Sequence, residues 1–279
     1  SQVFKTHTKG GSPLSDPFTR SVTIPGSPLH FFKPEGNGVS THDSTIESFT
    51  NYGSGADATP YNAIYKRKYW PLQRQNYNYI TTSYINEDSI VPLAVWGYAY
   101  VVPEKSYENG FTMGVGFWEI SNHTAHEGMI FENGIDGAGL WNKISVETTL
   151  TDATTRHKKI KIILHSKEEA GGAGNDSQIW VTDDHVIIPH QYNTVIVVWD
   201  GDEHSTPILK VNGSAINMTN TGQTFWPGNL NRIMQTNANY GDMVIYDSAL
   251  SGTDLEQLEA YFDFKYVTLP SSEPMFQDL

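Results

Sequence analysis

The chain contains no cysteine, which excludes a disulfide framework, a thiolate metal site and a cysteine nucleophile. It has no apolar run of roughly 18 residues and no apolar segment near its start, so we expect neither a membrane-spanning helix nor a signal peptide in the sequence. Charged residues make up only 18% of the chain, and Lys and Arg are scarce, which gives a formal net charge of −13. This balance disfavours a nucleic-acid-binding protein, because affinity for phosphate requires clustered cations.

The chain is instead rich in Gly, Asn, Thr and Tyr, and 12% of it is aromatic. From about residue 90 onward, short apolar runs recur between turn signals such as Asn-Gly. In the segment 159–165, Ile160 and Ile162 alternate with Lys159 and Lys161, so the basic run at 156–161 is expected to be the solvated face of a half-buried strand. The sequence therefore predicts an all-β fold, a two-sheet antiparallel jelly-roll sandwich.

The first forty or so residues contain five prolines and several Gly and Ser, with single apolar residues and no sustained period. We expect residues 1–44 to form an extended N-terminal arm. The arm carries too many apolar residues for a purely solvated tail. We therefore expect it to dock on its own body or on a neighbouring subunit, through Phe4, Phe18, Phe31 and Phe32.

The segment GDMVIYDSALSGTDLEQLEAYFDFKY, at 241–266, reads as a strand, a turn and one short helix. Ser251 and Asp254 form an acidic variant of a capping box at the start of this helix. The apolar residues that follow share one side of the helix, which indicates that it packs on an edge or rim of the sandwich. The sandwich is thus expected over residues 45–268, with a C-terminal tail at 269–279.

This segment and the stretch VIVVWDGDEHSTPILKVNGSAI, at 195–216, resemble the C-terminal half of concanavalin A-like lectin/glucanase domains of the laminin-G-like type. That family shows a strand ending in a short acidic loop, a strand ending in Asn-Gly or Asp-Gly, and a strand like G-x-x-x-x-Y-D-x-x-L-S before a short helix. The matching residues are Asp200, Gly201, Asn212, Gly213, Gly241, Tyr246, Asp247, Leu250 and Ser251. The resemblance covers about 75 residues and implies the sandwich fold. It is nearly silent on activity, because the superfamily includes sugar binders, adhesion modules, enzymes and structural proteins.

Enzymes of this superfamily carry motifs that the chain does not match. Members that cleave β-glucans show a Glu-x-Asp-x-x-Glu strand, whereas Glu119 and Glu132 here lack such partners. Alginate-type lyases show Gln-Ile-His, whereas the chain has Gln178 and Trp180 around Ile179 and offers no base for proton abstraction. We therefore expect a protein that is not an enzyme, and a polysaccharide-degrading enzyme is a remaining alternative.

One loop, DGDEH at 200–204, gathers hard oxygen ligands of the kind that calcium prefers. Laminin-G-like domains often hold calcium at a rim of the sandwich, so the resemblance implies Asp200 and Asp202 as candidate ligands. The alternative is a solvated hairpin loop in an acidic protein. Under that alternative the chain has no cofactor.

The stretch 61–85 interleaves aromatic residues with Lys and Arg. Aromatic planes flanked by polar side chains stack on sugar rings, but Tyr, Trp and Arg are also enriched in protein interfaces. A glycan site, a subunit or partner contact and a purely structural role therefore all stay open. The candidate residues for a glycan or partner contact are Tyr65, Tyr69, Trp70, Tyr77 and Tyr79.

The arm, the missing cysteine and the acidic composition together favour a structural or adhesive protein of a virus particle, of the bacteriophage head-decoration or fibre type. Its expected partners are capsid or other virion proteins and further copies of itself, and a cell-surface glycan is a further expected ligand. Neither nucleic acid nor membrane insertion is expected. The alternative is a secreted, extracellular carbohydrate-binding module with a lectin-like fold.

Overall fold

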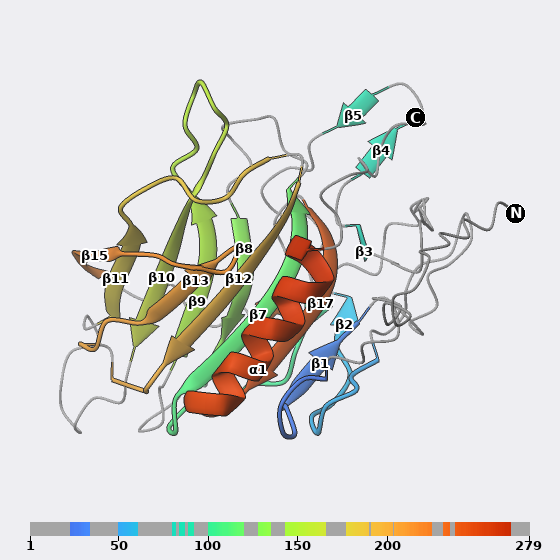
Figure 1. Cartoon of the computed structure of the whole chain (residues 1–279), viewed down its shortest axis with the longest axis vertical. Coiled ribbons are helices and arrows are strands. Elements are labelled where there is room, and N and C mark those ends of the chain that lie inside the picture. The colour runs from blue at the N-terminus through green and yellow to red at the C-terminus, as the bar shows by residue number, and fades with distance from the viewer. Residues whose placement is uncertain are drawn as a thin grey trace, which may run out of the picture.

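The computed structural model describes residues 23–33, 50–60, 80–81, 84–86, 89–91, 100–119, 128–134, 143–165, 177–189, 191–202, 204–224, 231–234 and 238–268. These residues are nearly all in antiparallel strands and the turns that join them (Figure 1). One α-helix, α1 (Gly252–Phe262), is followed by a short π-helical turn, η2 (Asp263–Thr268). Within these ranges, no helix is long and apolar enough to cross a membrane.

One sheet has seven strands in the order β1-β17-β7-β12-β13-β14, with β3 also beside β17. Its strands are β1 (His30–Phe32), β3 (Ile80–Thr81), β7 (Phe111–Glu119), β12 (Tyr192–Trp199), β13 (Ile208–Val211), β14 (Ser214–Ala215) and β17 (Ala238–Tyr246). The longest strands, β7, β12 and β17, lie next to one another in its centre.

The other sheet has eight strands in the order β15-β11-β10-β9-β8-β16-β6-β2. Its strands are β2 (Thr59–Pro60), β6 (Tyr100–Val101), β8 (Gly128–Asn133), β9 (Lys143–Thr149), β10 (Lys159–His165), β11 (Ser177–Thr182), β15 (Met218–Thr224) and β16 (Arg232–Ile233). A separate two-stranded hairpin joins β4 (Tyr84–Asn86) to β5 (Ser89–Val91).

The core lies between the two sheets, because alternate residues of each strand turn inward. On β12, Val195, Val197 and Trp199 are buried in one apolar cluster. On β10, Ile160 and Ile162 join the same cluster, as their alternation with lysine predicts. The predicted all-β, two-sheet antiparallel fold with one C-terminal helix is confirmed.

Helix α1 covers the outer face of the seven-stranded sheet and runs along β7 and β17 (Figure 1). The sequence led us to expect it at an edge or rim, and that expectation was wrong. The reason lies in small residues of the sheet: a Cβ atom at Gly116 would lie 2.7 Å from the Tyr266 ring, and Gly114 leaves similar room for Phe262. The aromatic rings fill these gaps and form a second apolar cluster with Ile196 and others.

The predicted capping box at the start of α1 does not form. Ser251 occupies the N-cap position with an extended backbone, but its side chain makes no capping hydrogen bond. The chain enters the helix through Gly252, whose φ of +54° is one that glycine adopts readily. The start of the helix therefore depends on this glycine and on packing, not on a side-chain cap.

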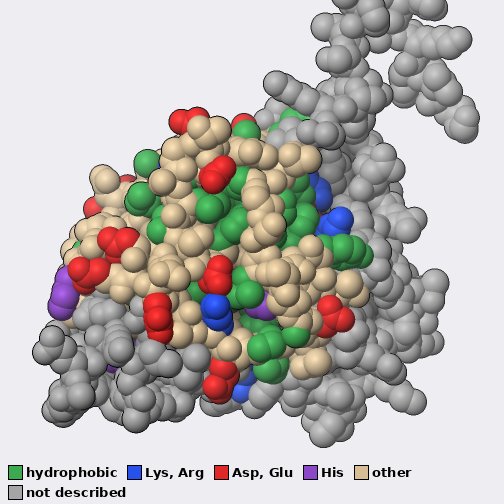
Figure 2. Space-filling view, turned by 90° about the horizontal axis from the view of Figure 1, so that it is seen from below, with side chains coloured by type: hydrophobic (Ala, Val, Ile, Leu, Met, Phe, Trp, Pro, Cys, Tyr) green, Lys and Arg blue, Asp and Glu red, His purple; other side chains and the backbone are tan. Residues whose placement is uncertain are grey.

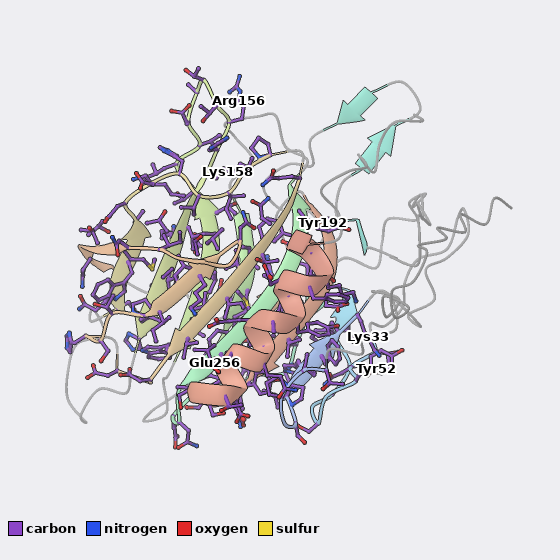
Figure 3. All side chains as sticks on the ribbon, in the orientation of Figure 1. Lys33, Tyr52, Arg156, Lys158, Tyr192 and Glu256 are labelled. Carbon is purple, nitrogen blue, oxygen red and sulfur yellow. The ribbon has the colours of Figure 1, made fainter. Side chains whose placement is uncertain are left out.

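The described part of the N-terminal segment packs on its own chain. Strand β1 pairs with β17 in antiparallel register, Phe32 is buried in the core, and Phe31 packs edge-on against Tyr261. The outer edge of β1 is occupied by Asn51, whose Oδ1 accepts the Phe31 N–H at 2.8 Å. Next to it, Lys33 lies over the Tyr52 ring (Figure 3). Residues 30–32 are therefore a strand of the sandwich.

Candidate binding face on the eight-stranded sheet

The outward residues of the eight-stranded sheet include many polar and charged side chains, and we call this surface the polar face. On β10, Lys159, Lys161, Ile163 and His165 alternate with the residues that enter the core. Ile163 is buried, yet it belongs to neither apolar cluster, as expected for a residue on the opposite face. By strand register, the polar face comprises Met129, Glu132, Ser145, Glu147, Lys159, Lys161, Ile163, His165, Ser177, Ile179, Val181 and Arg232.

One row of this face brings Arg232 and Glu132 together from segments far apart in the sequence. Ile233 of β16 pairs with Phe131 of β8, so the antiparallel register sets Arg232 opposite Glu132. Both side chains are nearly buried, at 3% and 5% exposure. Charged side chains are almost never so buried unless they are paired, and directly opposed residues on one sheet face are close neighbours. The polar face thus contains a nearly buried arginine opposite a nearly buried glutamate.

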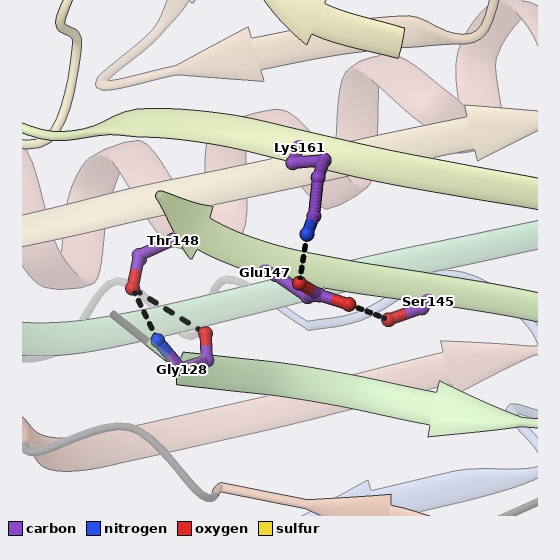
Figure 4. Close-up of polar contacts among 5 residues, drawn as sticks. All are labelled: Gly128, Ser145, Glu147, Thr148 and Lys161. Atoms are coloured by element: carbon purple, nitrogen blue, oxygen red, sulfur yellow. Dashed lines mark hydrogen bonds and ion pairs between the residues drawn. The ribbon is translucent and has the colours of Figure 1, made fainter. Parts of the chain in front are cut away.

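The row continues into a hydrogen-bonded network on β9 and β10 (Figure 4). Glu132 pairs with Ser145, whose hydroxyl donates to Glu147 Oε1 at 2.9 Å. The other carboxylate oxygen of Glu147 lies 2.6 Å from the Lys161 ammonium nitrogen. The Lys161 and Glu147 side chains keep 28% and 23% of their surface exposed, so this part of the face is open to solvent.

At the far end of β10, His165 Nδ1 lies 2.9 Å from the Ser177 hydroxyl. Both side chains are buried. Between this pair and the Lys161 network, Ile163 and the half-exposed Ile179 supply an apolar strip across β10 and β11. The face therefore combines fixed hydrogen-bonding groups with an apolar strip.

Among the described residues, the carboxylates and polar groups that resemble enzyme motifs do not form a catalytic pair. Glu132 lies beside Arg232, with Glu147 engaged by a serine and a lysine. Trp180 belongs to the core cluster, and Gln178, on the same side of β11, binds the Asn220 amide. The Gln-Ile-Trp segment thus turns its polar end away from the polar face. The structure does not describe the side chain of Glu119.

The side chains of the two candidate calcium ligands, Asp200 and Asp202, accept hydrogen bonds from the backbone of their own loop. Asp200 Oδ1 accepts the N–H of residue 202 at 3.0 Å, and Asp202 Oδ1 accepts the His204 N–H at 2.9 Å. Trp199 Nε1 donates to the carbonyl of Asp202 at 2.9 Å. Among the described residues, no group of three or more His, Cys, Asp or Glu is arranged to hold a metal ion. Calcium at Asp200 and Asp202 stays a prediction.

The remaining predicted site residues divide between two regions. Phe31 and Phe32 lie within the sandwich, as described above. The others lie outside the described residues: Phe4, Phe18, Tyr65, Tyr69, Trp70, Tyr77 and Tyr79. Arg232 was missed, because β16 is only two residues long and shows no period. The alternation in 159–165 did signal the polar face, but we read it as a solvated surface.

No family model matches the chain, and no curated protein matches it. Among solved structures, it is similar to the binding domain of botulinum neurotoxin serotype D, at 11% identity and a TM-score of 0.44, over 84% of this chain and 52% of that one. It is similar to the Ruminococcus gnavus IT-sialidase CBM40 bound to α2,3-sialyllactose, at 14% identity and a TM-score of 0.34, over 55% and 83% of the two chains. A third similarity is to the Trypanosoma rangeli sialidase in complex with the inhibitor DANA, at 11% identity and a TM-score of 0.41, over 85% and 33%.

The chain thus spans about half the length of the toxin domain and about a third of the Trypanosoma sialidase. Likenesses at these identities and scores carry no argument about function. The fold follows from the two sheets themselves.

Proposed function

We propose that this chain is a non-enzymatic, lectin-like module that binds a glycan on the polar face of its eight-stranded sheet. The observation that carries the proposal is the contrast between the two outer faces. The outer face of the seven-stranded sheet is filled by α1, whereas the polar face bears ordered, partly exposed polar groups and no described helix.

The chemistry of the polar face suits sugar hydroxyls. A sugar hydroxyl both donates and accepts, so it is recognised by carboxylates and ammonium groups set side by side, as Glu147 and Lys161 are. Ser145 fixes the second oxygen of Glu147, which lowers the entropy lost when a ligand binds. Ile179 and Val181 are half-buried beside them and offer an apolar surface for the C–H groups of a sugar ring.

A glycan array probed with the full chain tests this proposal. The Glu147→Gln and Lys161→Gln variants are expected to lose most of the binding of the wild-type protein, because each removes one partner of the fixed pair. Lys210→Gln is the matched control. Lys210 lies on the seven-stranded sheet and pairs with Glu259 of α1, and the exposed fractions of these two side chains are similar to those of Lys161 and Glu147.

Two results would contradict the proposal. One is the absence of any glycan ligand. The other is unchanged binding in Glu147→Gln and Lys161→Gln together with its loss in a Tyr69→Ala/Trp70→Ala variant, which would move the site to the aromatic stretch 61–85.

The setting that we propose for this module is a virus particle, to which the N-terminal segment attaches it. The support is the composition of the first residues and the lack of cysteine. Residues 23–33 already pack on their own chain, so attachment is assigned to residues 1–22, which include Phe4 and Phe18. Deleting residues 1–22 should then abolish incorporation into particles while leaving the sandwich folded. Secretion of the protein beside polysaccharide-utilisation genes would favour the extracellular alternative.

The absence of catalysis is part of the proposal. The polar face offers no described carboxylate pair away from cationic neighbours, and its described hydroxyl–imidazole contact, between Ser177 and His165, is buried. Incubation with neutral and acidic polysaccharides should release no shorter fragments. Depolymerisation that is lost in a Glu132→Gln variant would make the protein an enzyme.

A further inference from the structure

We infer that two copies of this chain pair edge to edge through strand β15, antiparallel to each other about a twofold axis at Thr219. The inference concerns an edge of the eight-stranded sheet and does not depend on what the polar face binds. It follows from a comparison of the strands that end the two sheets.

Three of the four terminal strands are protected or very short. On β1, the N–H of Phe31 is taken by Asn51, and its carbonyl accepts the Tyr52 N–H at 2.9 Å. Strands β14 and β2 have two residues each, and β2 ends in Pro60, which has no N–H to donate. Edge strands are commonly protected in such ways, because open backbone groups pair with other chains.

Strand β15 differs from these three. It has seven residues and pairs with β11 on one side, and no described strand lies on its other side (Figure 1). Residues 219–222 are exposed. The strand contains neither proline nor a charged residue, so it lacks two of the devices that keep an edge from pairing.

Charge also favours this edge as the place where two copies meet. The whole segment 211–231 has no charged residue and no histidine, in a chain of net charge −13. Figure 2 shows one end of the sandwich, where the charged side chains are mostly Asp and Glu. Copies that approach through acidic surfaces repel each other, whereas the uncharged edge adds no repulsion of its own.

The β11–β15 ladder shows which backbone groups are open. The Asp183 N–H donates to the Asn217 carbonyl at 3.2 Å, so this carbonyl points toward β11. Because the direction alternates along an antiparallel ladder, the N–H and C=O groups of Met218 and Asn220 point away from β11. The ladder becomes irregular just before Gly222, whose φ is +121°. The open edge is therefore short and ends at a bulge.

This short edge complements itself. With Thr219 opposite Thr219 of the other copy, Met218 lies opposite Asn220 of the other copy, and such a pair exchanges two N–H···O=C bonds. Directly opposed threonines are favourable on a sheet face. The Asp183 carboxylate accepts the Thr219 hydroxyl at 2.6 Å, and the Asp183 carbonyl accepts the Lys159 ammonium at 2.7 Å. The charges beside the axis are thus balanced within each copy.

The symmetry of the pair has a consequence for binding, which rests on the proposed function. Neighbouring antiparallel strands are related by an axis perpendicular to their sheet, so the two polar faces point to the same side of the dimer. The dimer then presents two glycan sites to one surface. Two linked sites bind a multivalent surface more tightly than one site does.

Sedimentation velocity of the full chain, without any glycan, tests the dimer at concentrations from about 1 µM to about 1 mM. We expect dimers to form as the concentration rises. Thr219→Lys sets two like charges opposite each other and should raise the dissociation constant at least about tenfold. Thr154→Lys adds the same charge on an exposed turn between β9 and β10 and should change it less than about twofold.

A second pair of variants probes the backbone. Asn220→Pro removes an N–H that β11 does not use, so it should weaken the dimer without breaking the ladder. Asn220→Ala keeps that N–H and loses only the side-chain contact with Gln178, so it is the matched control. Thermal melting of each variant shows whether it is folded.

Two results would overturn the inference and leave the proposed function standing. One is a chain that stays monomeric at every concentration. The other is a dimer that Thr219→Lys and Asn220→Pro weaken no more than their controls do.

A glycan array separates the dimer from the proposed function. The folded, monomeric Thr219→Lys variant should lose at least about tenfold in binding to the array and keep its affinity for the same glycan free in solution. Unchanged array binding would contradict the shared orientation of the two polar faces, and with it the pairing through β15. A dimer that binds no glycan would defeat the proposed function alone.

Discussion

The two outer faces of this sandwich are built from the same strand alternation and reach opposite results. On the seven-stranded sheet, outward positions include glycines and apolar residues, and the rings of Phe262 and Tyr266 fill the space over the glycines. On the eight-stranded sheet, outward positions include Lys161, which contacts Glu147 on the neighbouring strand, and Ser145, which bonds to Glu147 within its own strand. The first face is closed by the chain's own helix. On the second, most outward side chains are buried, and Lys161 and Glu147 keep part of their surface exposed.

The closed face contains a buried ionic contact, and the polar face contains a half-exposed one. Asp242 lies in an irregular part of β17, is fully buried and accepts both the Lys265 ammonium, at 2.6 Å, and the Tyr261 hydroxyl. Its backbone N–H donates to the Tyr266 hydroxyl at 2.6 Å, and burial raises the pKa of that tyrosine well above its usual value. The contact therefore holds α1 and η2 on the sheet. The Glu147–Lys161 contact, by comparison, joins only two neighbouring strands, β9 and β10.

The largest predicted effect comes from breaking the buried contact. Lys265→Met leaves the Asp242 carboxylate buried without its cation and should lower the free energy of unfolding by roughly 3–5 kcal/mol. Lys161→Met on the polar face should cost less than about 1 kcal/mol, because its partner stays solvated. Urea unfolding followed by tryptophan fluorescence measures both. Adding Asp242→Asn to Lys265→Met should recover part of the loss, and equal costs for the two single variants would contradict the contrast.

A second prediction uses pH to probe the edge of the closed sheet, at β1. Burial lowers the pKa of His30 from 6.5 to about 4, against the opposing attraction of Asp247. Between these values the unfolded chain binds more protons at this site than the folded chain does. The contribution of His30 is therefore fully present above pH 6.5 and is lost as the pH falls toward 4.

That loss should amount to roughly 3 kcal/mol in the free energy of unfolding. Urea unfolding at several pH values, in the wild type and in His30→Gln, isolates it from the titration of carboxylates. The slope of stability against pH between 4 and 6.5 should be smaller in the variant. Equal slopes in the two proteins would show that His30 is not held neutral.

Most of the fold was predictable from the sequence, because it depends on local alternation. Ile160 and Ile162 enter the core and Lys161 turns outward, as the pattern indicates. The helix over 252–262 was recognised from its apolar side. Its position on a face was not predictable, because it depends on Gly114 and Gly116 of β7, which are more than a hundred residues away in sequence and give no signal of their own.

The candidate site was less predictable than the fold. Glu132 was noticed only as an isolated carboxylate, and its neighbour Arg232 lies on a two-residue strand without any period. The two meet only through the strand order β9-β8-β16, which no local pattern specifies. The alternation within a strand thus predicts which residues face outward. Which charged residues lie opposite one another on neighbouring strands depends on the topology of the sheet.

A third prediction tests how closely the helix fits the closed face. Gly116→Ala places a methyl group against the Tyr266 ring and should cost about 1–3 kcal/mol in the free energy of unfolding, because the packed ring has little room to move. Thr221→Ala, on the exposed strand β15 of the other sheet, should change it by less than about 0.5 kcal/mol. Chemical denaturation compares the two. A tolerated Gly116→Ala would mean that η2 is loosely held.

The smallest predicted effect separates function from stability. The Lys161–Glu147 and Lys210–Glu259 pairs have nitrogen–oxygen distances of 2.6 and 2.5 Å and side-chain exposures between 23% and 28%. Double-mutant cycles with glutamine should give each pair a coupling free energy below about 1 kcal/mol, because both are screened by solvent. Since the two pairs then contribute equally little to folding, a binding defect that appears only on removing Lys161 has to come from the face on which that lysine lies. A coupling energy several times larger for one pair would remove Lys210 as a control and would give the polar-face pair a structural role.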